Sequence, residues 1–395
     1  MITVKTPFTC KDVDFDPSRI EELNAHFQRQ IELQRIFAAN YCLSRDGKVF
    51  AAASMGRLNY SEDDPSELKP DTIHRIASIT KIFTSTAIFK LVEDGYFRLN
   101  QSVGDLIPEM SVPPFKDITL AQLLSHTSGL QADSNCFENK YFKSPWDYIG
   151  MMKDTHWLKA GLSIGLRTKP GTEWAYCSFG FCILGEVISR VMGRSVHDFI
   201  ETELLAPCGM PDTFFPRDRP ETETERENIK KLLARGNSRD KEDDRDNADM
   251  VLGDKRKKTP FDNVPGTGGG LVSTASDLNR FGVMLMNGGT FEGKRVIGRR
   301  TVARMTENYT NEKNIDWCWG APGCYRQYGL GPDTQRTADN LYSPSTFFHE
   351  GAGACALVID PEERLVASWF VPLVNGVWNS GPLYNAAAVM WSGLK

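Results

Sequence analysis

The residues of this chain with the clearest chemical potential are a serine and a lysine three positions apart, Ser78 and Lys81. A serine hydroxyl attacks a carbonyl carbon only when a neighbouring group takes its proton. At a spacing of three residues in a helix, the hydroxyl and the amine lie on the same face, one turn apart. The pair therefore indicates acyl transfer, with Ser78 as nucleophile and Lys81 close enough to take part in proton transfer.

The pattern Ser-x-x-Lys occurs four times, and its context separates the four copies. The copies at Ser66, Ser238 and Ser392 lie in a polar loop, in a highly charged stretch and at the end of the sequence. Only Ser78 opens a long apolar helix, predicted over residues 78–94. There its N–H faces the positive end of the helix dipole and is a natural half of an oxyanion hole. Apolar neighbours would bury Lys81 and lower its pKa. The alternative interpretation makes Ser78 a simple helix N-cap.

Two hairpins and several helices are expected to surround this pair. Strands are predicted over residues 36–43, 49–53, 355–359 and 365–371, and helices over 17–34, 119–124, 178–204 and 383–391. Ser18 is the expected N-cap of the first of these helices. Because each end of the chain holds a hairpin with a flanking helix, the two ends are expected to share one antiparallel sheet.

Composition excludes some classes of protein. The 395 residues carry a formal net charge of −5, with 41% hydrophobic and 25% charged residues. This is ordinary globular composition, without the basic character of a nucleic-acid binder. The N-terminus lacks the apolar core of a signal peptide, and no run approaches the roughly 20 apolar residues of a membrane helix. We therefore expect a soluble, cytoplasmic protein with no membrane or nucleic-acid partner.

Three features that could suggest additional sites have simpler explanations. Residues 217–258 are densely charged and lack aromatic side chains, which is typical of an exposed, partly disordered insertion. The nine cysteines include no Cys-x-x-Cys pair, so small buried side chains are expected and not metal ligands. The glycine run at 268–270 lacks the Gly-Lys-Ser/Thr ending of a nucleotide-binding loop.

Five segments in order give the chain a wider resemblance, which spans roughly residues 35–375. They are residues 74–81 (HRIASITK), 124–130 (LSHTSGL), 170–178 (PGTEWAYCS), 268–278 (GGGLVSTASDL) and 349–351 (HEG). With these segments the chain resembles the class C β-lactamase and penicillin-binding-protein-like serine hydrolases. That group includes family VIII esterases, D-alanyl carboxypeptidases and related acyltransferases.

The resemblance implies an α/β (α+β) fold of the β-lactamase/transpeptidase type. Residues 1–75 and 265–395 would form an antiparallel sheet flanked by helices. Residues 76–264 would form a mostly helical subdomain that carries the charged insertion 217–258. The active site would lie between these parts of one catalytic unit, with Ser78 at the start of the central helix.

The second motif of this group is Tyr-x-Asn, and the matching residues here are Tyr176, Cys177 and Ser178. The resemblance implies that Tyr176 lies beside Ser78 and shuttles protons. Near Lys81 its phenolate would be stabilised, which would make it a general base. Without the resemblance, a half-buried structural tyrosine is the better interpretation. Ser178 would contact substrate but replaces an asparagine, and its shorter hydroxyl weakens the case for β-lactam or peptide recognition.

The third motif is usually Lys-Thr-Gly, and some members use His-x-Gly, which here reads His349-Glu350-Gly351. Gly351 would let a substrate approach the backbone closely. The N–H of Ala352 would complete the oxyanion hole beside that of Ser78. His349 would either present a partial positive charge to a substrate carboxylate or hydrogen-bond Tyr176. By contrast, His126 is expected to bond backbone and not substrate.

The function that the resemblance implies is hydrolysis of a small carboxylic ester through an acyl-enzyme on Ser78, with Lys81 and Tyr176 as base. β-Lactamase, D-amino-acid peptidase or amidase, and acyltransferase activities share this mechanism and stay open. A non-catalytic binding protein on the same scaffold is disfavoured because Ser78, Lys81 and Tyr176 are all present. The partner would be a small-molecule acyl substrate. No cofactor or metal is implied, and the oligomeric state is not indicated.

Overall fold

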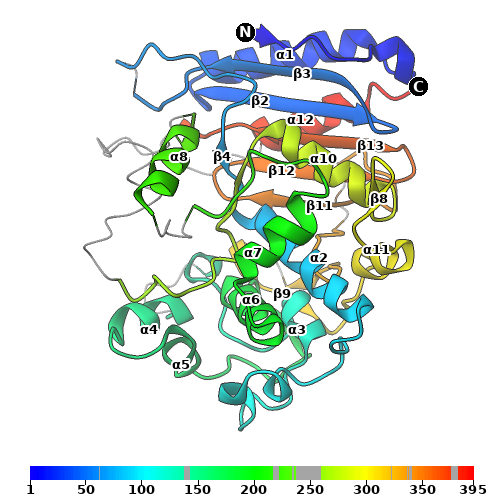
Figure 1. Ribbon diagram of the computed structural model, residues 1–395. Coiled ribbons are helices and arrows are strands. Elements are labelled where there is room, and N and C mark those ends of the chain that lie inside the picture. Colours follow the sequence, from blue (N-terminus) through cyan, green and yellow to red (C-terminus); the bar gives the residue numbers. More distant parts are fainter. Residues whose placement is uncertain are drawn as a thin grey trace.

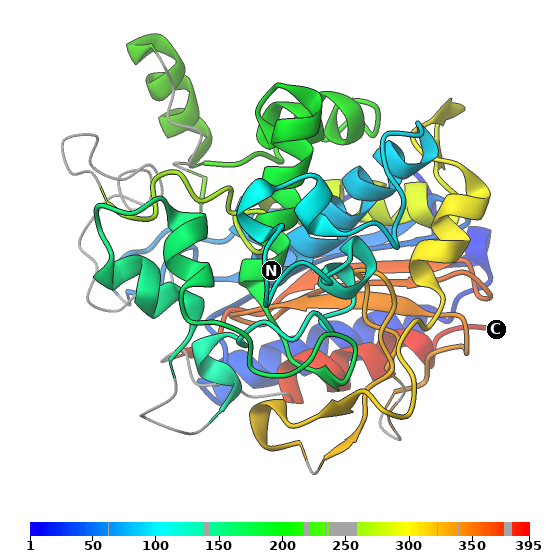
Figure 2. The same cartoon turned by 90° about the horizontal axis from the view of Figure 1, so that it is seen from below.

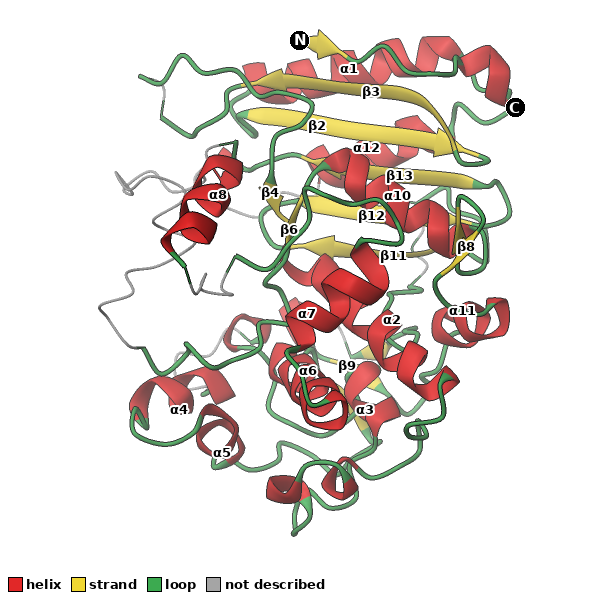
Figure 3. Cartoon of the chain, in the orientation of Figure 1, coloured by secondary structure: helices red, strands yellow, loops and turns green. Residues whose placement is uncertain are grey.

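The fold is organised around one six-stranded sheet with helices on both faces, as the computed structural model in Figure 1 shows. The structure describes residues 1–61, 63–137, 143–216, 222–233, 235–236, 259–321, 323–335, 337, 340–374 and 381–395. Strands gather at one end of the molecule, and the other end is mostly helix and loop (Figure 3). This is the predicted β-lactamase/transpeptidase-like architecture.

Both ends of the chain contribute to the sheet, as the two hairpin patterns predicted. Its order is β1 (Ile2–Thr3), β3 (Lys48–Gly56), β2 (Ala38–Arg45), β13 (Leu365–Phe370), β12 (Cys355–Asp360) and β11 (Phe347–Gly351). Every neighbouring pair is antiparallel. The central strands are buried along nearly their whole length because both faces are covered, and β12 and β13 have only one polar residue each. Strand β11, at one edge, was not predicted as a separate strand.

Helices cover the sheet in two layers. On one face α1 (Pro17–Glu32) and α12 (Gly381–Trp391) lie side by side, drawn in blue and red in Figure 2. On the other face lies α10 (Ala275–Met286), which contacts β2, β12 and β13. The expected cap of the first helix was wrong. Asp16 is the N-cap and accepts from the Ser18 N–H, because Pro17 occupies the first helical position.

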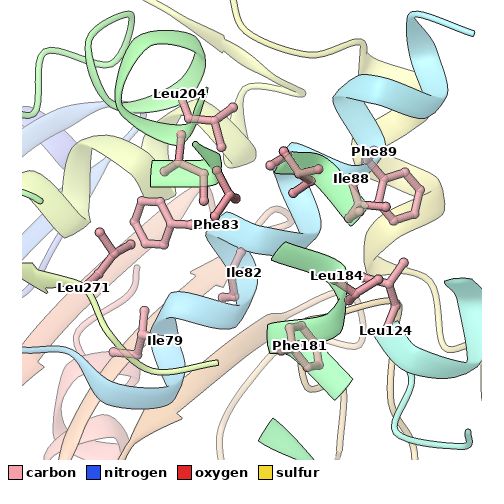
Figure 4. Packing of buried hydrophobic residues seen from close by; sticks show 14 of the residues in the cluster. Ile79, Ile82, Phe83, Ile88, Phe89, Leu124, Phe181, Leu184, Leu204 and Leu271 are labelled. Atoms are coloured by element: carbon pink, nitrogen blue, oxygen red, sulfur yellow. The ribbon is translucent and has the colours of Figure 1, made fainter. Parts of the chain in front are cut away.

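The helical part surrounds α2 (Thr80–Glu93), which is buried on nearly all sides. Its neighbours are α6 (Ser178–Met192), α7 (Val196–Ile200) and α11 (Arg299–Thr306), and α3 (Leu120–Leu124) packs on α6. Figure 4 shows apolar side chains of α2, α6 and the adjoining segments packed together. The helical segment predicted over 178–204 is confirmed, but it is divided. Gly193 ends α6 in the left-handed conformation, Ser195 caps α7, and a π-helical turn follows at Glu201–Leu205.

Short elements connect the two parts. β4 (His74–Arg75) pairs with β6 (Val272–Ser273), where the chain passes between sheet and helices. The subdomain boundaries after residues 75 and 264 stay predictions. The remaining short elements are β5 (Glu173–Trp174), β7 (Thr290–Phe291), β8 (Lys294–Arg295), β9 (Ile315–Asp316), β10 (Cys324–Tyr325), α4 (Pro145–Met151) and α5 (Trp157–Leu162). None of the helices described here is both long and apolar enough to cross a bilayer.

Part of the predicted charged insertion is an ordered helix. Residues 217–221, 234 and 237–258 lie outside the described residues. Within the described part, α8 (Glu223–Leu233) buries Leu233 against Phe214. Arg235 forms ion pairs with Asp212 at 2.8 Å and Asp71 at 3.3 Å. The described part of the segment is therefore docked on the protein and is not a solvated loop.

Candidate active site

Ser78 lies in a single 3-10 turn (Ala77–Ile79) that leads from β4 into α2. Its side chain makes no cap bond to either helix, so the N-cap interpretation of Ser78 does not hold. Ala77, the preceding residue, has φ of +45°, a left-handed conformation that costs an L-residue about 1–2 kcal/mol. A hydrogen bond to a distant segment anchors this turn. The N–H of Ile76, the residue before the turn, donates to the Leu271 carbonyl. This strained turn places the serine at the wall of a cavity.

Lys81 is completely buried, and its amine has three acceptors. Its Nζ lies 3.2 Å from Ser78 Oγ, 3.0 Å from Ser178 Oγ and 2.6 Å from the Gly268 carbonyl oxygen. Burial lowers the pKa of Lys81 to about 8, and the negative charge of Asp133 opposes that shift. A substantial fraction of the amine is therefore neutral near physiological pH. The expected burial of Lys81 and its proximity to Ser78 are both found.

Tyr176 lies beside both residues, as the resemblance implied. Its hydroxyl shares a hydrogen bond with Ser78, and the Lys81 amine lies 4.6 Å from the centre of its ring. The pKa of Tyr176 is nevertheless raised well above its usual value, mainly by burial, with Asp133 adding to the effect. The expectation of a stabilised phenolate is therefore wrong for the resting site, because desolvation outweighs Lys81. Tyr176 carries a neutral hydroxyl.

Asp133 is a member of the site that sequence reasoning missed. It precedes a short 3-10 helix (Ser134–Cys136) and accepts from the Ser178 hydroxyl at 2.6 Å, from the Ser178 N–H at 3.0 Å and from Trp146 Nε1 at 3.1 Å. Its own N–H donates to the Tyr176 carbonyl. The carboxylate thus orients the second motif and stabilises the positive charge of Lys81. Asp133 belongs to no recognisable pattern in the sequence, and only the fold brings it here.

His349, on β11, is buried, but it plays neither of the roles expected for it. Burial, followed by repulsion from Lys81, lowers its pKa to about 3, so the ring is neutral. Nδ1 lies 2.7 Å from the Glu350 carbonyl, and Nε2 lies 3.2 Å from the Tyr328 hydroxyl. Because a carbonyl only accepts, Nδ1 carries the proton. The Tyr328 hydroxyl has one proton and donates it to the Gly331 carbonyl at 2.8 Å. His349 therefore neither presents a positive charge nor bonds Tyr176, and Tyr328 is a second residue that the motif search missed.

Gly351 is required by the protein's own backbone. A Cβ at this position would lie 2.3 Å from the Ile76 carbonyl oxygen and 2.5 Å from Cys355 Sγ. The absent side chain thus lets β11 pass against the turn that carries Ser78. Gly351 also lines the cavity, and the close approach of a substrate to its backbone stays a prediction. Ala352 lines the same cavity as Ser78. The oxyanion hole formed by these two N–H groups stays a prediction.

The glycine run at 268–270 and His126 position the motif residues through backbone contacts. The Gly268 carbonyl accepts from Lys81, and a Cβ on Gly268 would lie 2.8 Å from the Ser178 carbonyl oxygen. Glycine is therefore needed for this loop to fit between two motifs. His126 accepts the Cys177 N–H through Nδ1 at 3.1 Å, which confirms its predicted backbone role.

A second serine pattern, Gly161-Leu162-Ser163-Ile164-Gly165, has the spacing of the hydrolase nucleophile elbow. Its structural context is different, because Ser163 is the exposed C-cap of α5 and does not lie in a turn between a strand and a helix. The Ser163 hydroxyl donates to the Ala160 carbonyl at 2.7 Å. Ser163 is therefore a helix-ending residue.

The site opens into a cavity of about 990 Å³ between the sheet edge and the helical part. Ser78, Tyr176, Ser178 and Ala352 all line it. Arg326 also lines it, but its charge is engaged by Asp333, with which it forms an ion pair, and by Asp316 at 3.7 Å. A serine hydroxyl and a neutral tyrosine hydroxyl thus meet at the cavity wall, with the buried Lys81 amine behind them, a set that can move a proton off the serine.

We predict that Asp133→Asn lowers the pKa of Lys81, because it removes the negative charge that partly offsets burial. The expected decrease in the titration midpoint is about one pH unit. Carbon-13 NMR of protein labelled at lysine Cε would measure it, with Lys81→Ala to assign the signal. Asp316→Asn is the matched control, since Asp316 is also buried but pairs with Arg326. An unchanged midpoint in Asp133→Asn would show that Asp133 does not act on the amine.

Comparison with known proteins places the chain in a family. A family model described as Beta-lactamase matches residues 23–379. Protein Rv1367c of Mycobacterium tuberculosis is 31% identical over 345 residues, which cover 80% of this chain and 82% of that protein.

Two solved structures share the fold. A penicillin-binding protein homologue from Caulobacter crescentus has a TM-score of 0.71 at 19% identity, and a family VIII carboxylesterase has a TM-score of 0.68 at 21% identity. Each alignment covers 95% of this chain and 98% of the other. At these identities the two structures support the fold alone. Because the family model matches most of its length, the protein belongs to the Beta-lactamase family.

Proposed function

We propose that the protein hydrolyses a small carboxylic ester through an acyl-enzyme on Ser78. The observation that carries this proposal is the position of the Lys81 amine, 3.2 Å from Ser78 Oγ and buried so that its pKa is about 8. An amine with that pKa is neutral often enough to accept a proton near neutral pH and acidic enough to return it. The family VIII carboxylesterase among the structural neighbours is consistent with this chemistry.

In the first step, Ser78 Oγ bonds to the ester carbonyl carbon while its proton passes to the neutral amine of Lys81. The carbonyl electrons move onto oxygen, and the N–H groups of Ser78 and Ala352 would stabilise that oxyanion. When the oxyanion collapses, the bond to the alcohol oxygen breaks. The leaving oxygen takes a proton from the Tyr176 hydroxyl, which regains one from the Lys81 ammonium. Water then repeats the sequence on the acyl-enzyme, releasing the carboxylic acid and free Ser78.

Two features favour esters over β-lactams and peptides. His349, in the place of a lysine, is neutral and therefore provides no charge for a substrate carboxylate. Ser178 donates its hydroxyl to Asp133 and accepts from Lys81, so it does not reproduce the amide contacts of an asparagine. Loss of one charged contact costs on the order of 1.5–3 kcal/mol. This loss should reduce the rate most for an amide substrate, because the amide nitrogen must be protonated as it leaves. An alkoxide leaves more readily.

The competing functions use the same first step and differ in the later steps. A β-lactam or a D-amino-acid amide would also acylate Ser78, and an alcohol or amine acceptor would replace water in an acyltransferase. A non-catalytic binding protein would not need the hydrogen bonds that join Ser78, Lys81 and Tyr176. These bonds favour an enzyme.

We predict that intact-mass spectrometry detects an acyl adduct after mixing with a short-chain p-nitrophenyl ester, and that Ser78→Ala abolishes it while keeping the fold. On one preparation, kcat/KM for this ester should exceed that for nitrocefin and for a D-alanyl peptide by at least about tenfold. A preference of that size for nitrocefin or the peptide would overturn the ester assignment. Wild-type turnover by Ser78→Ala would overturn the nucleophile.

We also predict that Lys81→Ala and Tyr176→Phe each reduce kcat by about 10³-fold or more, because removing any member of a proton-transfer unit loses most of its effect. The double variant should then be little slower than the slower single variant. Steady-state rates on the same ester would measure all three. If the two losses multiply in the double variant, Lys81 and Tyr176 act independently and the shared proton path is wrong.

A further inference from the structure

An aromatic side chain, Trp319, stands at the wall of the cavity beside Tyr176. Its ring centre lies 5.1 Å from that of Tyr176 and 6.4 Å from that of Trp174. The side chain lines the cavity, yet 49% of its surface is exposed. A large apolar side chain left open next to reactive groups offers a surface to a ligand.

The backbone at Trp319 is held in a costly conformation. Its φ is +53° and its ψ +37°, the left-handed region that bulky side chains seldom adopt. Strain of this kind, on the order of 1–3 kcal/mol, persists where the surroundings impose it and is concentrated at ligand sites. Here the indole contacts the neighbouring rings of Trp174 and Tyr176 on the side away from solvent.

The cavity wall holds further aromatic side chains among polar residues such as Asp133 and Glu350. Trp146, Phe261 and Phe348 line it as well, and its volume of about 990 Å³ far exceeds the needs of a two-carbon acyl group with a small alcohol. Pockets of this size usually enclose drug-sized ligands with a mostly apolar lining. At least one side of the substrate is therefore expected to be bulky.

We propose that Trp319 binds the alcohol part of the ester and that this part carries an aromatic ring. The inference rests on the proposed function, in which the Tyr176 hydroxyl gives its proton to the leaving oxygen. The alcohol part attached to that oxygen must therefore lie next to the Tyr176 ring. The Trp319 ring packs against that same ring. An aromatic ring there stacks on the indole face or meets it edge-on, which stabilises it beyond simple burial.

The chain contains a matched control for Trp319. Trp317, two residues earlier, is also 49% exposed, but it is not among the residues that line the cavity. Its ring instead covers Gly323, where a Cβ would lie 2.3 Å from it. Replacement of either tryptophan by alanine removes the same side chain from the same short segment, and only one of the two changes the cavity wall.

The kinetic test compares two acetate esters of matched size, 2-naphthylmethyl acetate and its fully saturated decahydro counterpart. In the wild-type protein the aromatic ester should have the higher kcat/KM by about fivefold or more. Trp319→Ala should abolish that ratio, Trp319→Phe should keep part of it, and Trp317→Ala should leave it unchanged. Equal ratios in wild type and Trp319→Ala, or equal losses in Trp317→Ala and Trp319→Ala, would overturn the proposal. Far-ultraviolet circular dichroism and Tm confirm that each variant is folded.

A binding measurement separates this inference from the proposed function. In a Ser78→Ala background, calorimetry with 2-naphthylmethanol should give a Kd that Trp319→Ala weakens by about fivefold or more and Trp317→Ala does not. If no ester is hydrolysed and this difference is present, the proposed function fails while the aromatic site stands. If esters are hydrolysed and the Kd is the same in all backgrounds, the proposed function stands and the aromatic site is overturned.

Discussion

The burial of one amine, that of Lys81, is the interaction on which the rest of the site depends. Lowering its pKa from 10.5 to about 8 corresponds to a cost of about 3 kcal/mol for the charged form. Because the pKa of this lysine is higher in the unfolded chain, its contribution to the free energy of unfolding rises as the pH increases from about 8 to 10.5. The cost is limited by three acceptors, of which the Gly268 carbonyl is nearest at 2.6 Å. Each acceptor comes from a different motif, so one lysine holds three parts of the chain together.

The tyrosine and histidine side chains near Lys81 are held uncharged, which leaves the Lys81 amine to take up the proton. Burial keeps Tyr176 protonated and holds His126 and His349 neutral. Asp133, which accepts from the Ser178 hydroxyl, provides an opposing charge, and its effect on Lys81 limits how far the pKa falls. Proton transfer from Ser78 is therefore directed to a single amine.

Much of this arrangement could be predicted from the sequence, because it follows local rules. The apolar run after Ser78 forms a buried helix, hairpin patterns at both ends form one sheet, and Ser78, Lys81 and Tyr176 meet as the motifs imply. The features that could not be predicted depend on contacts between distant segments. Asp133 is one carboxylate among many in the sequence, and its importance comes from a loop that meets α6.

The same limit explains the errors at His349. Whether His349 is charged depends on how deeply β11 is buried, and the role of Gly351 depends on the approach of the Ile76 backbone. The break near residue 193 had a local signal, a glycine followed by a serine cap, that hydrophobic periodicity concealed.

The central claim is that the neutral amine of Lys81 takes the proton of Ser78, and the pH dependence of acylation tests it most directly. Stopped-flow measurement of the single-turnover acylation rate with a p-nitrophenyl ester, from pH 6 to 10, would report this step alone. The account predicts a rate that rises about tenfold per pH unit below the pKa of Lys81, about 8, and then becomes constant. A rate that is independent of pH across this range, or that begins to rise only near pH 10, would contradict it.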